Sequence, residues 1–304
     1  MTTQTKCHTR DTRPVYRLHI NTACDDRAAS FRFCLDNGVI GMGWGIGDED
    51  LSWTAYVEER EAQGVTVDSS VRRLHDLPMG ALVWLRDQRG AYYIAEITGE
   101  WKYMHGPAAD RVDIHNVRPA RIYAAGTQSM VPGKVLNSFI PSRTLQSISD
   151  DAAARFTASL FDTLAGKSSD WVATREEVLR SCLSARDLED LVSAYLQCEK
   201  GYMVLPASWR PDTPAYEYVL HHRDGHDAVV QVKGGWSTVP RDAASLPVEL
   251  VERVYVFSPT GSYGPDAAPN VATIKLDEIV EFMKANLQSL PPTVQHWVTS
   301  SVAE

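Results

Sequence analysis

The stretch 216–235 constrains the fold most, because it places strand-forming residues on both sides of a polar turn. It runs Tyr-Glu-Tyr-Val-Leu-His-His-Arg-Asp-Gly-His-Asp-Ala-Val-Val-Gln-Val-Lys-Gly-Gly, a pattern that predicts two strands joined by a turn. Strand side chains alternate between faces, so Gln231 and Lys233 point the same way. Since the start of one hairpin strand meets the end of the other, Glu217 is expected beside them.

These three side chains have complementary chemistry. The carboxylate of Glu217 and the amide oxygen of Gln231 are ligand types that hold hard divalent cations. The ammonium group of Lys233 can polarise a water or stabilise an oxyanion. A simpler alternative is a cross-strand ion pair between Lys233 and Glu217, worth less than about 1 kcal/mol if exposed.

Three histidines flank the same turn, at His221, His222 and His226. Their spacing raises the alternative of a zinc site. Neighbouring strand residues point to opposite faces, however, and an exposed hairpin usually leaves its histidines in solvent. We therefore expect these histidines to be solvated.

Composition indicates a globular protein of two domains, since the chain has 304 residues, 44% of them hydrophobic and 23% charged. No apolar run is long enough for a membrane span, and the N-terminal segment lacks the apolar core of a signal peptide. The cysteines form no close pair and no zinc spacing, which predicts reduced thiols in the cytoplasm. They are Cys7, Cys24, Cys34, Cys182 and Cys198.

The net charge of -9 is unusual for a nucleic-acid binder, but its distribution is uneven. Between residues 102 and 143 only Asp110 and Asp113 oppose six basic residues. Such a run is either a solvated loop face or a surface for phosphates. The expected phosphate contacts are Lys102, Arg118, Arg121, Lys134 and Arg143.

The first half of the chain predicts a small curled β-barrel, because short strands are separated by tight turns. Strands are expected at 15–20, 39–44, 80–86, 91–103 and 112–122, with helices at 51–64 and 71–77. The runs Gly-Val-Ile-Gly-Met-Gly-Trp, Gly-Ala-Leu-Val-Trp-Leu-Arg and Tyr-Tyr-Ile-Ala-Glu-Ile-Thr-Gly-Glu-Trp-Lys-Tyr resemble the PUA-like group, especially its EVE-type members. This resemblance covers about residues 30–145.

The PUA-like resemblance implies nucleic-acid binding, in several members with a flipped, modified base held in an aromatic cage. A flipped base needs a flat apolar wall and a few polar edges. The aromatic residues predicted for such a cage are Trp44, Trp101 and Tyr103. The alternative is that these rings belong to the core, as aromatic residues on strands usually do.

The chain is predicted to divide into a recognition domain at 1–148, a helical linker at 149–183 and a second domain at 184–304. Apolar residues recur at helical spacing in the linker. In the second domain Ser184-Ala-Arg-Asp starts a helix that Gly201 ends. Strands at 202–206, in the hairpin, at 250–257 and at 271–274 follow, with a helix at 277–286.

This order of elements resembles the PD-(D/E)XK nuclease superfamily, closest to the Mrr-like restriction endonucleases. The resemblance rests on the helical acid ahead of Gly201-Tyr202, on Glu217, and on the half-motif Gln231-Val-Lys233. It implies a restriction-endonuclease-like mixed sheet flanked by helices, so the whole chain is predicted to be a two-domain protein of the α+β/α/β class, with a PUA-like β-barrel in its first half.

The nuclease resemblance also implies Mg²⁺-dependent phosphodiester hydrolysis, with Mn²⁺ as a substitute ion. Glu217 and Gln231 would bind the metal, Glu189 would complete the shell, and Lys233 would orient or activate water. Glu217 stands where aspartate is usual in the family, and the nearby Pro211-Asp212 pair makes Asp212 a rival ligand. Without the resemblance, Glu189 is simply a surface acid on a helix.

Together the two resemblances predict a modification-dependent DNA endonuclease, similar to type IV restriction enzymes in phage defence. Double-strand cutting needs two active sites, which favours a homodimer. One alternative is an inactive reader that binds modified nucleic acid through the first domain. Another is a regulatory or protein-interaction module without salt-sensitive nucleic-acid binding.

Overall fold

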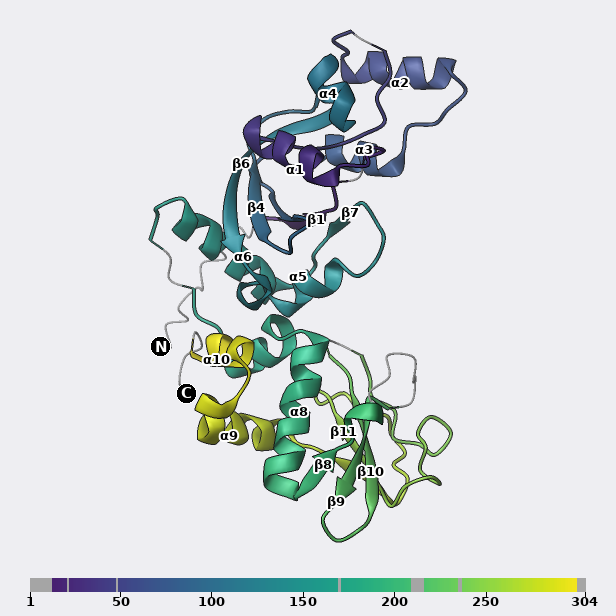
Figure 1. Ribbon diagram of the computed structural model, residues 1–304, viewed down its shortest axis with the longest axis vertical. Helices are drawn as coiled ribbons and strands as arrows, with labels where there is room; N and C mark the ends of the chain where they lie inside the picture. The colour runs from purple at the N-terminus through teal and green to yellow at the C-terminus, as the bar shows by residue number, and fades with distance from the viewer. Residues whose placement is uncertain are drawn as a thin grey trace, which may run out of the picture. The chain divides into compact units, whose positions relative to one another are not determined.

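The computed structural model of the protein describes residues 13–20, 22–47, 49–168, 171–208, 216–234 and 237–299 (Figure 1). Their contacts divide the chain into two compact units. The first takes the chain up to Val131 and again Ser138–Trp171, whereas the second takes Pro132–Asn137 and the chain from Val172 onwards. No helix in the described ranges is both long and apolar enough to cross a membrane.

The first unit is built on a curled sheet with the strand order β2-β6-β4-β3-β1-β7, in which β5 pairs with β6. The long β6 pairs with β2 and β5 through its first half and with β4 through its second. Among the described strands no pairing joins β2 to β7, so the sheet is an open half-barrel and not a closed barrel. The strands are β1 (Val15–Leu18), β2 (Val39–Met42), β3 (Leu82–Arg86), β4 (Tyr92–Ile97), β5 (Lys102–Tyr103), β6 (Asn116–Gly126) and β7 (Leu145–Ser147).

The long strand expected at 91–103 is broken into β4 and β5 around Gly99. A Cβ on Gly99 would lie 2.7 Å from the Cγ atom of Pro119, so only glycine lets the chain pass this closely. The helices of this unit are α1 (Arg27–Asp36), α2 (Trp53–Ala62), α3 (Ser69–His75), α4 (Pro107–Val112) and α6 (Asp151–Leu164), with a short 3₁₀ turn at Gln128–Met130.

Helix α6 lies in the predicted linker but packs on the first unit. The indole Nε1 of Trp84 donates to Thr157 Oγ1 at 3.0 Å, and both residues are fully buried. Near the end of the helix Asp162 forms an ion pair with Arg13 at 3.0 Å. The expected linker is therefore divided between the units, and its first helix belongs to the fold of the first unit.

The second unit has a five-stranded sheet in the order β12-β11-β10-β9-β8. Strands β8, β9 and β10 pair antiparallel, whereas β10, β11 and β12 run parallel. Helix α8 (Ala185–Lys200) packs against the sheet beside α9 (Leu276–Asn286) and α10 (Pro292–Thr299). The strands are β8 (Tyr202–Val204), β9 (Tyr218–His222), β10 (Asp227–Val232), β11 (Arg253–Phe257) and β12 (Val271–Thr273).

Helix α8 begins and ends where its sequence predicts. Ser184 and Asp187 form a reciprocal capping box, and Gly201 ends the helix in the left-handed conformation at φ 75°. Ahead of it lie α7 (Arg175–Glu177) and a π-helical turn (Val178–Cys182). Short 3₁₀ turns occupy Pro206–Ser208 and Leu287–Ser289.

Helix α5 (Gly133–Ser138) shows why the boundary expected near residue 148 differs from the observed division. A Cβ on Gly133 would lie 2.1 Å from the carbonyl oxygen of Leu183, so the helix start is pressed against the segment that leads into α8. This contact joins residues 132–137 to the second unit, and no local sequence signal announces it.

We predict that Thr157→Val destabilises the first unit by about 1–3 kcal/mol, because the buried indole N–H of Trp84 loses its acceptor. Urea unfolding followed by circular dichroism measures the change. Thr163→Val is the matched control, since Thr163 is an exposed threonine of the same helix. Equal stability of the two variants would contradict the assigned role of the Trp84–Thr157 bond.

Candidate nuclease site and aromatic pocket

The start of β9 and the end of β10 bring Glu217 and Gln231 together. The backbone N–H of Glu217 donates to Val230 O at 2.8 Å, and Gln231 Nε2 donates to Glu217 Oε1, also at 2.8 Å. Gln231 is 2% exposed. Just beyond the strand, the backbone N–H of Lys233 donates to Phe257 O at 3.1 Å, which continues the pairing with β11. The predicted cross-strand contact is therefore made by the amide, not by the lysine.

Helix α8 supplies the second carboxylate, Glu189. The hydroxyl of Tyr218 on β9 donates to the carbonyl oxygen of Glu189 at 3.1 Å and so fixes the helix over the strand. Burial, followed by the neighbouring charges of Glu217 and Asp190, raises the pKa of Glu189 to about 7. The charges of Arg186 and then Lys233 act in the opposite direction.

The pKa of Glu217 is also subject to opposing effects. Burial raises its pKa, while the charge of Lys233, the backbone N–H of Val232 and the amide of Gln231 all lower it. Two half-buried carboxylates thus repel one another beside a single ammonium group. Bringing a cation to this position would relieve the repulsion.

The donor set fits a hard divalent cation. Glu189 and Glu217 offer carboxylate oxygens, and Gln231, whose N–H₂ group donates to Glu217, would offer its amide oxygen. Magnesium accepts few protein oxygens and keeps several waters, so two carboxylates and one amide suffice. Within the described ranges no group of three His, Cys, Asp or Glu residues is placed to hold a metal. The rival Asp212 lies outside these ranges.

The hairpin histidines have other partners. His221 Nδ1 contacts Asp227 Oδ1 at 2.7 Å, and the rings of His222 and His226 stack at 4.4 Å. His226 Nε2 contacts the hydroxyl of Tyr202 at 3.1 Å. The three imidazoles therefore do not gather around one point.

The first unit contains an aromatic pocket of about 470 Å³ at the start of α2 and the end of α3. Trp53 stacks on His75 with ring centres 4.0 Å apart, and its edge-on contact with Trp101 measures 5.1 Å. A volume of this size suits a small planar ligand. The lining residues are Leu51, Ser52, Trp53, His75, Leu77, Met79, Glu100, Trp101 and Arg118.

Of the three residues predicted for a base cage, only Trp101 lines this pocket. Tyr103 is 6% exposed, and its hydroxyl both donates to and accepts from the backbone of Ile46. Trp44 packs against the buried core instead. Trp53 and His75 were not predicted, because the sequence marks them only as residues of two expected helices.

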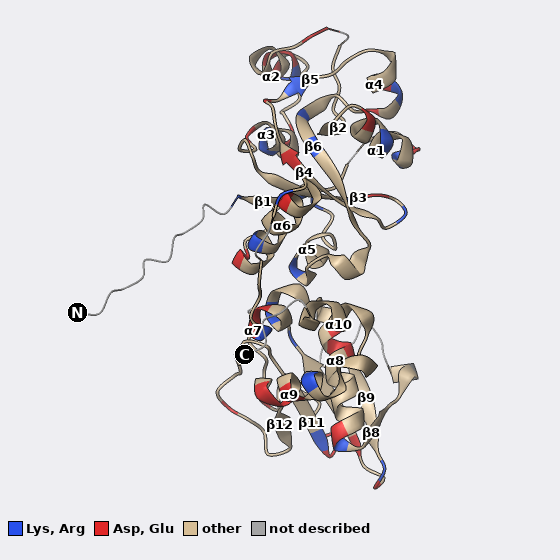
Figure 2. Ribbon diagram, turned by 90° about the vertical axis from the view of Figure 1, so that its left-hand side faces the viewer, with Lys and Arg blue, Asp and Glu red and all other residues tan. Residues whose placement is uncertain are grey.

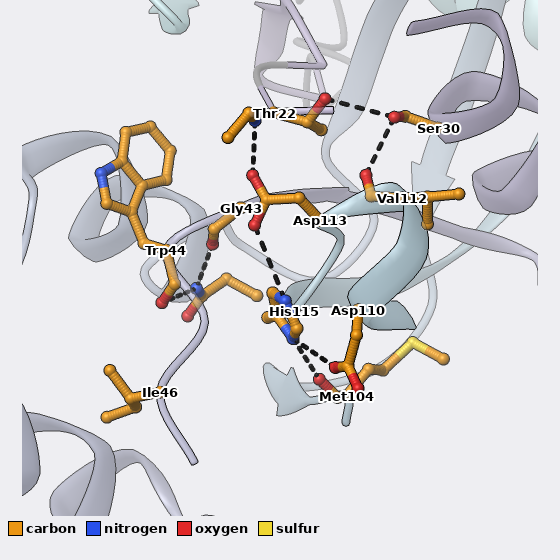
Figure 3. A network of polar contacts seen from close by, with 12 residues as sticks. Thr22, Ser30, Gly43, Trp44, Ile46, Met104, Asp110, Val112, Asp113 and His115 are labelled. Carbon is orange, nitrogen blue, oxygen red and sulfur yellow. Dashed lines mark hydrogen bonds and ion pairs between the residues drawn. The ribbon is translucent and has the colours of Figure 1, made fainter. Parts of the chain in front are cut away.

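A polar network holds the loop that follows β2 (Figure 3). Asn116 Nδ2 donates to Gly43 O at 2.6 Å, and His115 Nδ1 contacts Met104 O at 2.9 Å. A Cβ on Gly43 would lie 2.3 Å from a carboxylate oxygen of Asp113, so any other residue here would require the Asp113 side chain to move. The carboxylate of Asp113 also accepts the backbone N–H of Ala23 at 2.5 Å.

The same loop positions the aromatic pocket. Trp44 adopts the left-handed conformation at φ 63°, which is strained for a residue of its size. Its carbonyl oxygen accepts the hydroxyl of Tyr56 on α2 at 2.9 Å. Tyr56 in turn contacts the rings of Trp53 and Trp101. The network therefore ties α2 to the loop through Tyr56, beside the ring of Trp53.

The predicted phosphate contacts do not form one surface. Arg118 and Arg121 both belong to β6, on which Figure 2 shows Lys and Arg positions in blue. Arg118 is 3% exposed, however, and its guanidinium donates to four backbone carbonyls. Arg121 contacts Glu96 at 3.8 Å. Lys102 is exposed, whereas Lys134 belongs to the second unit. Arg143 lines a second pocket of the first unit.

No protein-family model matches the sequence, and no curated protein matches it either. Among solved structures, the chain is similar to the YTH domain of the Zygosaccharomyces rouxii MRB1 protein, determined in complex with N6-methyladenosine RNA. The two share 13% identity over 51% of this chain and 89% of that chain, with a TM-score of 0.25. A likeness of this size leaves function to be argued from the sites themselves.

We predict that Glu189 makes stability depend on pH. Its raised pKa favours the protonated folded form, so its contribution is complete below the ordinary value of 4.5 and disappears as pH rises through about 7. Glu189→Gln is expected to flatten the fall in thermal midpoint over this window. Glu199→Gln, an exposed change on the same helix, is the control and should follow the unaltered protein. Parallel curves for all three would refute the assigned pKa.

Proposed function

We propose that the second unit hydrolyses phosphodiester bonds of nucleic acid with the help of a divalent metal ion. The observation that carries this proposal is the hydrogen bond from Gln231 to Glu217, with Glu189 and Lys233 near enough for their charges to act on the same group of residues. A carboxylate pair with a nearby ammonium group matches the charge that develops when a phosphate is attacked by water. The mixed sheet with its parallel β10 and β11 adds the topology expected for such a site.

Each residue has a separate role in the proposed reaction. Glu189 and Glu217 would hold the ion, and the amide oxygen of Gln231 would complete its protein ligands. When bound, magnesium neutralises phosphate charge and lowers the pKa of a water. Lys233 would direct its ammonium group to that water or to a phosphate oxygen. The reaction forms a bond from phosphorus to the water oxygen and breaks the bond to the leaving sugar oxygen, which gains a proton.

We predict that Lys233→Gln lowers the cleavage rate by about a hundredfold or more, because the charge near the phosphate is lost. Cleavage of phage DNA carrying modified bases, with Mg²⁺ or Mn²⁺ and the full chain, measures this rate. Lys284→Gln, which removes an exposed charge of α9, should cut normally. Equal rates for the Lys233 and Lys284 variants would overturn the proposed site.

A second candidate function, base recognition, is favoured by the aromatic pocket of the first unit. Trp53 and Trp101 offer flat apolar surfaces, while the exposed Glu100 offers a polar group along the lining. This combination of surfaces suits a base that has left its stack. Joined to the second unit, it supports a modification-dependent DNA endonuclease that acts in phage defence as a homodimer. Without cleavage, the same pocket supports a reader of modified nucleic acid.

We predict that Trp53→Ala weakens binding of a short single-stranded DNA by about five- to a hundredfold, the usual loss for one stacked base. Fluorescence anisotropy without divalent cations measures the affinity and avoids cleavage. Phe33→Ala is the control, because Phe33 is a half-buried aromatic residue outside the pocket. Unchanged affinity of a folded Trp53 variant would rule out the pocket as the base site.

A further inference from the structure

Among the described contacts of the first unit, the buried Arg17 has no acidic partner. The guanidinium of Arg17 is 0% exposed, and its acceptors are Gln146 Oε1 at 3.1 Å and backbone carbonyls of the segment 141–144. All of these acceptors are neutral. Burial and then the charges of Arg143 and Arg86 lower the pKa of Arg17 to about 10.

A second pocket of about 400 Å³ opens where this charge reaches the surface. Arg73 enters it from α3, and Arg143 enters from the segment that leads into β7. Both arginines are exposed, and neither forms an ion pair with a carboxylate within the described ranges. The pocket is lined by Tyr16, Arg73, Asp76, Leu77, Arg143, Leu145, Gln146 and Ser147.

The acidic residue that lines this pocket, Asp76, already has a hydrogen-bond partner. Asp76 Oδ1 contacts His75 Nδ1 at 2.7 Å, and His75 is the ring on which Trp53 stacks. Arg73 makes one long hydrogen bond, from Nη1 to Leu145 O at 3.4 Å. The other N–H groups of Arg73 and Arg143 can therefore donate to an anion, and guanidinium groups suit phosphate oxygens in particular.

The arginine pocket and the aromatic pocket are neighbours. Leu77 lines both of them, and the consecutive residues His75 and Asp76 line one each. A ligand that filled both would present a flat ring to Trp53 and an anion to the arginines. A nucleotide within a nucleic-acid strand has this combination of groups.

We propose that Arg73 and Arg143 bind a backbone phosphate next to the base held in the aromatic pocket. This inference rests on the proposed base-recognition function and extends it from a base to a nucleotide in a strand. Arg17 does not touch the phosphate, but its unpaired charge strengthens the local positive potential. The two pockets together would favour nucleic acid over a free base.

The test compares Arg73→Gln/Arg143→Gln with Arg72→Gln/Arg89→Gln in the full chain. The control removes equal charge from two exposed arginines, one of them adjacent to Arg73 on α3. Binding of a short single-stranded DNA without divalent cations is measured against salt concentration. We expect the pocket variant to bind about tenfold more weakly, with a salt slope smaller by about 0.7 to 1. The salt slope of the control variant should stay closer to that of the unaltered protein than the slope of the pocket variant does.

Comparison with Trp53→Ala separates this inference from the function on which it rests. A loss of affinity in the tryptophan variant alone would overturn the phosphate site and leave base recognition intact. A reduced salt slope in the arginine-pocket variant alone would support the phosphate site and remove the base site. Equal effects of the pocket and control pairs would overturn the inference, because general charge would then explain binding. Circular dichroism verifies that each variant is folded.

Discussion

The second unit depends on the placement of two carboxylates that repel one another. Glu189 and Glu217 lie on different elements, and each would be more easily ionised in water than in this half-buried space. The fold keeps them together by the Tyr218 hydrogen bond to the helix and by the Gln231 hydrogen bond to Glu217. Burial of these carboxylates therefore opposes their ionisation, so the ionised pair costs the fold stability.

The first unit uses its polar groups differently, to support apolar ones. Asn116 and Tyr56 hold the backbone of Gly43 and Trp44, and the bond from Tyr56 ties α2 to this loop. The aromatic pocket is thus shaped by a hydrogen-bonded loop behind it. Rings supported in this way have little freedom to collapse into the pocket, which keeps a flat surface available.

The sequence was most informative where a site depends on strand alternation. The positions of Glu217 and Gln231 follow from one hairpin, and the capping box at Ser184 predicts where α8 begins. The aromatic pocket was harder to predict, because Trp53 and His75 meet only through the packing of two separate helices. The periodicity of a helix shows which of its faces is buried, but not which other helix packs against that face. Nothing in the sequence therefore favoured Trp53 and His75 over Trp44 and Tyr103. Arg118 was assigned to the surface because its buried carbonyl partners are distant in sequence.

The close contact between Gly133 and Leu183 has a consequence for how the protein can be divided. Since residues 132–137 belong to the second unit and 138–171 to the first, the polypeptide enters the second unit, returns, and enters it again. No single cut can release both halves whole. A fragment that begins after residue 150 would lack residues 132–137, which belong to the second unit. A gene fusion or domain exchange would therefore have to keep both segments of that unit.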